Sequence, residues 1–112
     1  LIERSDQLLE QISIHTLFYV LSVRLNPDKV NKDQRECFNF SSGIIKNIHI
    51  RNKVAVVSDK AQQNCDIEVF ADEIEFKRIL VGTQSPVTAI SSGKIQINGS
   101  NTDFLQFLTN FR

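Results

Sequence analysis

The chain has little of what most recognisable functional sites require. Its four glycines are scattered, at positions 43, 82, 93 and 99, so it has no glycine-rich phosphate-binding loop. Acidic and basic residues balance at 13 each, which gives no electrostatic case for binding nucleic acid or an anionic membrane surface. No apolar run approaches the roughly 20 residues that cross a bilayer. We therefore expect no nucleic-acid partner and no transmembrane segment.

Methionine is absent, and the chain begins with Leu1-Ile2-Glu3-Arg4, without a basic start before an apolar run. We therefore expect a C-terminal fragment of a longer polypeptide, with no signal peptide in this stretch; the compartment is left open. The hydrophobic share of 41% and the charged share of 23% are ordinary for a soluble globular domain. A length of 112 residues suits one domain with one core, covering residues 1–112.

Two cysteines and two histidines are the residues that could suggest thiol or metal chemistry. Cys37 and Cys65 fall in predicted strands, where we expect two buried thiols acting as small apolar side chains; their spacing allows a disulfide without demanding one. His15 and His49 have no ligand-spaced partner, so no metal site is expected. A Cys65–His49 nucleophile pair would lack an activating partner.

Hydrophobic periodicity and boundary residues predict alternating helices and strands. The predicted helices cover residues 1–11, 14–25, 73–81, 86–91 and 101–111, with a short turn at 27–30. Ser13, Ser85 and Ser100 are expected to cap the helices that follow them, and residues 51–53 to form a tight hairpin turn. The predicted strands cover residues 36–41, 44–50, 54–57, 65–71 and 94–98, and Lys46 is a misfit on the apolar face of the second strand. This order predicts an α+β fold, in which helices pack on one side of a mostly antiparallel five-stranded sheet.

Some local features carry more specific expectations. The stretch from Val54 to Val57 is apolar on both faces, which predicts a strand covered on both sides. Asp72, followed three residues later by Glu75, resembles a capping box at a helix start. The adjacent carboxylates of Asp72 and Glu73 are explained by that helix N-terminus rather than by acid–base catalysis, so no catalytic residue is expected.

The last predicted helix is unusually rich in large apolar side chains. Four of them are expected to form one face: Phe104, Leu105, Leu108 and Phe111. Phe107 adds a fifth, which widens the stripe beyond what a small core usually needs. This excess suggests that the helix borders more than an ordinary core.

Two stretches resemble known families. Residues 91–99, SSGKIQING, resemble the SGK-hydrophobic-x-hydrophobic-x-G turn of the sterol carrier protein type-two family. Residues 17–30, LFYVLSVRLNPDKV, resemble the LLxxLAVRLxPxKA helix that opens the C-terminal domain of bacterial alkyl sulfatases, with Ser22 in place of the usual Ala. The connection at residues 82–86 is shorter than the same connection in some members of the family. The resemblance therefore does not fix the length of any pocket.

The resemblance implies a sterol-carrier-like module that follows a metallo-β-lactamase-type catalytic domain. Its implied partners are an aliphatic or lipid-like small molecule and the catalytic domain of the same polypeptide. Its implied function is to bind an alkyl chain and so to assist the recruitment of aliphatic sulfate esters to that domain. The His-x-His-x-Asp-His zinc motif of alkyl sulfatases is absent here, so zinc is expected in the catalytic domain and no cofactor in this chain.

The expected ligand site is a hydrophobic pocket between the sheet and its helices. Its expected lining residues are Phe18, Leu21, Phe76, Leu80, Val87, Ile90, Phe104, Leu108 and Phe111. The same side chains could instead fill an ordinary core. Two other functions stay open: a stand-alone lipid or sterol carrier of the same fold, and a dimerisation or interaction module.

Overall fold

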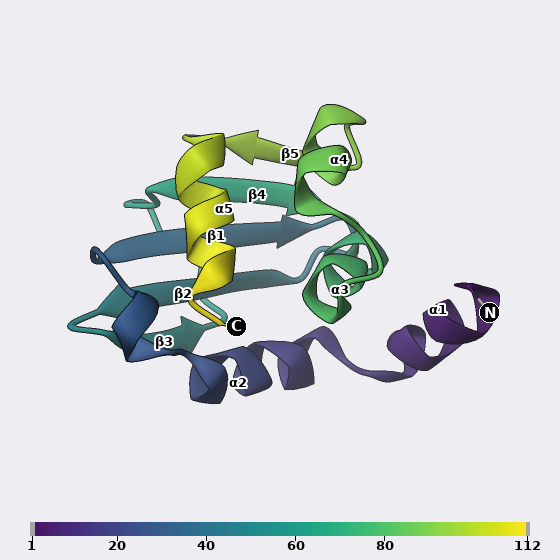
Figure 1. Cartoon of the computed structure of the whole chain (residues 1–112), viewed down its shortest axis with the longest axis horizontal. Helices are drawn as coiled ribbons and strands as arrows, with labels where there is room; N and C mark the ends of the chain where they lie inside the picture. Colours follow the sequence, from purple (N-terminus) through teal and green to yellow (C-terminus); the bar gives the residue numbers. More distant parts are fainter. Residues whose placement is uncertain (1, 112) are drawn as a thin grey trace.

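In the computed structural model, which describes residues 2–111, five strands form one sheet in the order β3-β2-β1-β4-β5. The strands are β1 (Gln34–Phe40), β2 (Ile45–Arg51), β3 (Val54–Ser58), β4 (Ile67–Ala71) and β5 (Ile95–Asn98). The helices are α1 (Ile2–Gln11), α2 (Ile14–Arg24), the 3-10 helix η1 (Pro27–Lys29), α3 (Glu73–Val81), α4 (Pro86–Ser91) and α5 (Asn101–Thr109). Figure 1 shows α5 lying across the sheet, α3 and α4 beside one end of the strands, and α2 along the β3 edge.

The central pair of strands is parallel, whereas the other pairs of the described sheet are antiparallel. β1 pairs with β2, β2 with β3, and β4 with β5 in antiparallel fashion, and β1 pairs in parallel with β4. The predicted α+β fold with a mostly antiparallel sheet is confirmed. The parallel pair arises because the segment 59–66 returns the chain to the start of β1, where Glu36 lies opposite Ile67.

Turn and cap residues set the element boundaries much as the sequence predicts. Asn52 and Lys53 have φ angles of 52° and 63°, which is the left-handed backbone that a tight β2–β3 hairpin needs. Three serines cap helices by accepting a hydrogen bond from a backbone amide in the first turn: Ser13, Ser85 and Ser100. The predicted hairpin and these helix starts are therefore confirmed.

The predicted capping box of α3 is wrong. Asp72 is the N-cap residue, but its side chain makes no capping hydrogen bond and instead accepts one from the Ser41 hydroxyl. Glu75 pairs with Arg78 at 2.5 Å rather than reaching back to Asp72. The Asp72 carboxylate is drawn away by a tertiary partner, which sequence spacing alone does not reveal, and the Glu75 carboxylate by a residue one turn further along α3.

Phenylalanine side chains form the centre of the core between the sheet and the helices. Five of them are completely buried: Phe18, Phe38, Phe76, Phe104 and Phe107. The rings of Phe38 and Phe76 have centroids 4.8 Å apart. Burying such a side chain stabilises the fold by about 1.5–3 kcal/mol. The space beneath the helices is thus largely filled by aromatic rings.

The buried face of α5 differs from the predicted one. Phe107 is completely buried, whereas Leu105 is only half-buried. The true stripe runs through positions 104, 107, 108 and 111, which follow the spacing of one helical face. Phe107 is therefore a core residue, and the idea that it exceeds the needs of the core is wrong.

The strand β3 is an edge strand with one open face. Val54 and Val56 are 57% and 58% exposed, so the prediction of a strand covered on both sides is wrong. Ala55 and Val57, which alternate with them, lie opposite Ile50 and Ile48 of β2 and face the helices. An all-apolar run does not by itself distinguish a central strand from an edge strand.

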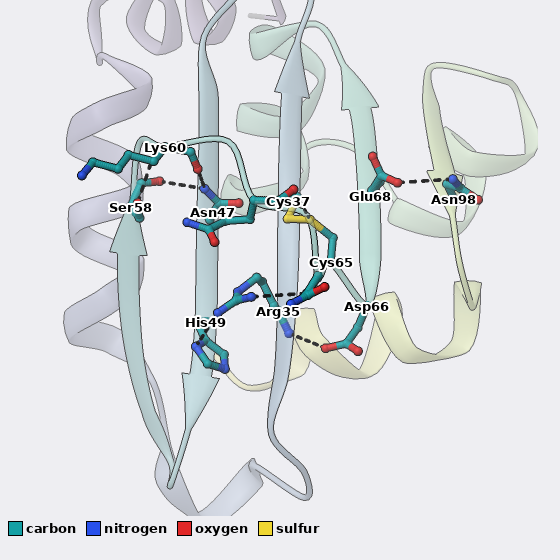
Figure 2. Close-up of a disulfide and its surroundings, with 12 residues drawn as sticks. Arg35, Cys37, Asn47, His49, Ser58, Lys60, Cys65, Asp66, Glu68 and Asn98 are labelled. Atoms are coloured by element: carbon teal, nitrogen blue, oxygen red, sulfur yellow. Dashed lines mark hydrogen bonds between the residues drawn. A yellow bond between two sulfur atoms is a disulfide. The ribbon is translucent and has the colours of Figure 1, made fainter.

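The segment 59–66 is fixed over the sheet face opposite the helices (Figure 2). Cys37 of β1 and Cys65 form a disulfide, with their Cα atoms 5.9 Å apart. The Asn47 side-chain amide also donates a hydrogen bond to the carbonyl of Lys60. The expectation of two free thiols is therefore wrong, and Cys65 precedes β4 rather than lying in a strand. Because its sulfur is bonded to Cys37, Cys65 also cannot act as a nucleophile paired with His49.

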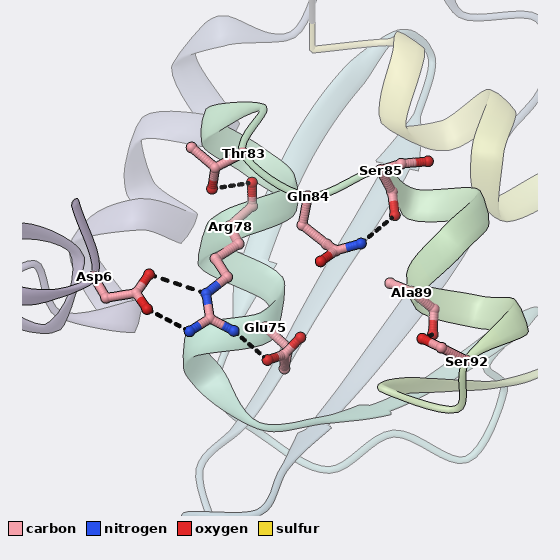
Figure 3. Close-up of polar contacts among 8 residues, drawn as sticks. All are labelled: Asp6, Glu75, Arg78, Thr83, Gln84, Ser85, Ala89 and Ser92. Atoms are coloured by element: carbon pink, nitrogen blue, oxygen red, sulfur yellow. Dashed lines mark hydrogen bonds and ion pairs between the residues drawn. The ribbon is translucent and has the colours of Figure 1, made fainter. Parts of the chain in front are cut away.

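Charged contacts hold α1 against α3 (Figure 3). The guanidinium of Arg78 donates to both carboxylate oxygens of Asp6, at 3.0 and 2.5 Å. The Lys77 ammonium donates to the carbonyl of Leu9 at 3.1 Å, and the Leu9 side chain is buried. α1 therefore packs as part of the domain. None of the helices within residues 2–111 is both long and apolar enough to cross a membrane.

Candidate functional site

An apolar pocket lies where the C-terminal parts of α2, α3 and α5 converge. Its volume is about 170 Å³. Its lining residues are Leu17, Val20, Leu21, Arg24, Ile79, Leu80, Val81, Leu108 and Phe111. The pocket therefore sits at the edge of the phenylalanine core, between helix ends, and not in the middle of the layer between helices and sheet.

The spacing of residues along α2 builds one wall of this pocket. Leu17, Val20, Leu21 and Arg24 follow the i, i+3, i+4, i+7 pattern, so they share one face of the helix. Leu21 is only 7% exposed, whereas Val20 is 36% exposed. The wall thus passes from the buried core to solvent.

Arg24 is the only charged residue in the lining, the other eight being apolar. It lies in the last turn of α2 and is exposed. Within residues 2–111 its guanidinium has no hydrogen bond or ion pair. A cavity lined by eight apolar residues, with one unpaired cation at its rim, suits a molecule with an apolar body and an anionic end.

The size of the pocket limits what can enter it. A cavity of about 150 Å³ is known to hold benzene, and pockets for drug-sized ligands run to about 300–1,000 Å³. At about 170 Å³, the pocket has room for roughly six carbons without any movement of the helices. A longer alkyl chain would have to displace side chains or leave part of its length outside.

The nine residues predicted to line a pocket fall into three groups. Four of them line this pocket: Leu21, Leu80, Leu108 and Phe111. Three others are completely buried in the phenylalanine core: Phe18, Phe76 and Phe104. Ile90 is half-buried against that core, and Val87 is 59% exposed on α4. Contact of any of them with a ligand stays a prediction.

Five lining residues were not predicted: Leu17, Val20, Arg24, Ile79 and Val81. Leu17 and Val20 belong to the broad apolar face of α2, which was visible in the sequence. Arg24 had a sufficient explanation as a cation at a helix C-terminus. The sequence signal for these residues was the presence of apolar side chains in the last turns of two predicted helices. Only the fold shows that these turns meet.

Glu36 is a completely buried carboxyl group on the helix-facing side of β1. One of its oxygens accepts a hydrogen bond from the Gln34 side chain, and the other has no partner among the described residues. Burial first, and the nearby charge of Asp66 second, raise the pKa of Glu36 from its ordinary 4.5 to about 9. The group is therefore protonated at neutral pH. It does not line the pocket.

A wider depression of about 500 Å³ lies at the ends of β1 and β4, beside the start of α3. Its acidic side chains already have partners: Asp72 accepts from Ser41, and Glu75 pairs with Arg78. Glu73 likewise accepts from Ser42. Asp72 and Glu73 thus tie the start of α3 to the β1–β2 turn, and Glu75 is paired within α3, so all three carboxylates are engaged in structural contacts.

The residues present do not fit a metal site. Among the side chains that the structure describes, no three from His, Cys, Asp or Glu gather in a way that could hold a metal ion. The nitrogen Nδ1 of His49 lies 3.2 Å from a guanidinium nitrogen of Arg35. The lining of the pocket between α2, α3 and α5 is what supports binding of an apolar molecule.

Comparison with known families identifies the fold and its context. A family model described as "Alkyl sulfatase C-terminal" matches residues 3–112. The solved structure of the inverting sec-alkylsulfatase Pisa1 from Pseudomonas sp. is similar, with a TM-score of 0.84 and 20% identity over 91% of this chain. The match covers 17% of the Pisa1 chain, so this chain spans a small part of that protein.

Sterol carrier proteins share the same fold. Sterol carrier protein 2 from Yarrowia lipolytica, in its apo form, gives a TM-score of 0.62 and 16% identity over 86% of this chain and 89% of its own. Palmitated SCP2L2 from Aedes aegypti gives a TM-score of 0.60 and 19% identity over 88% and 93%. No curated protein matches the chain significantly. The expected sterol-carrier-like fold is confirmed.

Proposed function

Because the chain belongs to the alkyl sulfatase C-terminal family, we propose that its pocket between α2, α3 and α5 binds the aliphatic tail of a sulfate ester. In this proposal the ester is cleaved by a separate catalytic domain of the same polypeptide, where zinc is expected. The present chain supplies binding and performs no bond chemistry. The observation that carries the proposal is a pocket whose lining is apolar except for one arginine.

The shared fold supports a lipid-like ligand. One structural neighbour, SCP2L2 from Aedes aegypti, was solved in a palmitated form. In the present chain, the layer beneath the helices is largely filled by buried phenylalanines. The free volume lies instead at the helix ends, which is where the proposal puts the alkyl chain.

The pocket volume sets the expected strength of binding. Burying each methylene contributes about 0.8 kcal/mol, so roughly six carbons contribute about 5 kcal/mol before ordering costs. Ordering costs take up part of this gain, so binding of a free alkyl sulfate should be weak, no tighter than the high micromolar range and weaker, in the millimolar range, once those costs are counted. Such affinity suits a domain that raises the local concentration of substrate and releases it readily.

The first test fills the pocket and measures binding of octyl sulfate by calorimetry, below its micelle concentration. The wild type should bind about one molecule per chain with a negative heat-capacity change. Val20→Phe places a larger side chain at the rim and should weaken binding about tenfold, because the loss of two buried methylenes is worth about 1.6 kcal/mol.

The matched control is Val23→Phe, the same substitution on the same helix at a residue that is 65% exposed and outside the pocket. It should bind octyl sulfate as the wild type does. Equal binding by a folded Val20→Phe variant would contradict the proposed site.

An interaction module is the second candidate function. Tyr19 and Val23 are 68% and 65% exposed on the outer side of α2, next to the pocket rim at Val20. Exposed apolar residues that group on one helix often mark a protein-binding surface. A molecular mass that rises with concentration in light scattering, together with no uptake of octyl sulfate, would favour this function over ligand binding.

A further inference from the structure

The pocket constrains the polar end of its ligand as well as the tail. We propose that Arg24 binds the anionic head group of a single-chain alkyl sulfate at the pocket mouth, so that the tail points inward and the sulfate points outward. This inference rests on the proposed function, because it requires that the pocket take an alkyl tail. The inference makes Arg24 a specificity-determining residue that favours ligands with a negatively charged head group.

The position of Arg24 supports this role. It lies one turn beyond Val20 and Leu21 on the same face of α2, where the apolar wall reaches solvent. Its aliphatic stem can cover apolar surface while the guanidinium stays in water. A tail that fills the cavity leaves its head group at this rim, beside the one charge in the lining. That charge is positive, so it complements a sulfate.

A structural role at helix C-termini is the competing explanation for Arg24, because three such ends converge here. However, the carbonyls of Arg78 and Ile79 in the last turn of α3 accept hydrogen bonds from the amides of Thr83 and Gly82. The carbonyl of Asn110, just after α5, accepts one from the amide of Asn26 at 2.7 Å. Among the described residues, Arg24 donates to none of these carbonyls. Its donors are therefore available to a ligand.

The chemistry of the guanidinium fits the head group. Its planar donors can bind two oxygens of a sulfate at once, which an ammonium group does less specifically. Because the site is exposed, the ion pair should strengthen binding by only about three- to fivefold. Hydrolysis would convert the sulfate ester to an uncharged alcohol. The same residue would then favour release of the product over the substrate.

The experiment compares octyl sulfate with 1-octanol, using calorimetry at low salt. The wild type should bind octyl sulfate about three- to fivefold more tightly than octanol. Arg24→Gln should reduce the affinity for octyl sulfate to that for octanol and leave octanol binding unchanged. Arg24→Lys should retain part of the preference. The matched control, Arg51→Gln, removes an exposed arginine at the end of β2 and should change neither affinity.

Each other outcome has a definite meaning. Equal affinities for the two ligands in the wild type would overturn the role of Arg24 and leave the alkyl pocket standing. Equal weakening of both ligands by Arg24→Gln would show that the residue only shapes the pocket, and would also overturn it. Competition by inorganic sulfate at the same concentration would indicate a simple anion site. Binding of neither ligand by the wild type would refute both this inference and the proposed function.

Discussion

At the scale of single residues, Glu36 is an ionisable group completely buried in the core. It lies in the core beneath the helices, with one carboxyl oxygen unpartnered among the described residues. Burial and the charge of Asp66 raise the pKa of this carboxyl to about 9, and they outweigh the Gln34 hydrogen bond and the charge of Lys32, which lower it. In an unfolded chain the same carboxyl would ionise near its ordinary 4.5. The fold therefore binds a proton that the unfolded chain releases.

The consequence is a stability that falls as pH rises. Between pH 4.5 and about 9 the folded chain holds one more proton at Glu36 than the unfolded chain does. The free energy of unfolding should then decrease by about 1.4 kcal/mol per pH unit from this group. Below pH 4.5 its contribution is fully present, and above about 9 the slope should vanish.

Glu36→Gln should remove this slope and stabilise the protein above neutral pH, because glutamine imitates the protonated acid. Urea unfolding from about pH 5 to about pH 8 measures the effect. Glu68→Gln, the same change on the neighbouring strand β4, should keep the wild-type slope. An unchanged slope in Glu36→Gln would contradict the buried, protonated state.

At the scale of elements, the segment 59–66 depends on its covalent link to the sheet. It spans the open face between β3 and β4 and is fixed by the disulfide and by the Asn47 contact to Lys60. The disulfide joins residues 28 positions apart, so it restricts a substantial loop in the unfolded chain. The helix-facing core does not depend on it directly.

Replacing Cys37 and Cys65 together by alanine should lower the free energy of unfolding by about 2–4 kcal/mol. A thiol reductant should destabilise the wild type by a similar amount and should not affect the double variant. Urea unfolding with and without reductant checks both statements. A wild type whose unfolding is insensitive to reductant would show that the link does not stabilise the fold.

The sequence predicts local features of these elements, such as helix caps, better than it predicts contacts between residues far apart in the chain. Ser13, Ser85 and Ser100 were correctly read as caps, because a cap needs only residues in the next turn. Lys46, an apparent misfit on the apolar face of β2, is explained only by its ion pair with Asp59 at 2.5 Å. Such contacts depend on how the chain returns to the sheet, which the sequence pattern does not specify.

The same limit applies to the candidate site. Periodicity correctly marks Phe18, Phe76 and Phe104 as apolar and inward-facing, but it cannot tell a filled core from a pocket. These rings fill the layer, and free volume remains only where helix ends meet. Leu80 and Leu108 line that volume because α3 and α5 converge there, and this convergence follows from the tertiary packing.

At the scale of the whole molecule, the sheet and core form a support, and the small pocket between α2, α3 and α5 lies at its edge. The sheet and the phenylalanine core hold α2, α3 and α5, and the Asp6–Arg78 contact adds α1 behind α3. The remaining cavity is apolar with one cation at its rim. This arrangement suits a domain that holds an aliphatic tail and leaves the charged end accessible to another domain.

The most direct test of this central claim is to map where octyl sulfate binds, by following backbone amide shifts of the isotope-labelled chain in NMR. The shifts should be confined to the pocket walls, at residues 17–24, 79–81 and 108–111. They should saturate together and be much smaller in Val20→Phe. Shifts concentrated on β3 or on the segment 59–66, or a general collapse of the spectrum, would contradict a preformed alkyl site between the three helices.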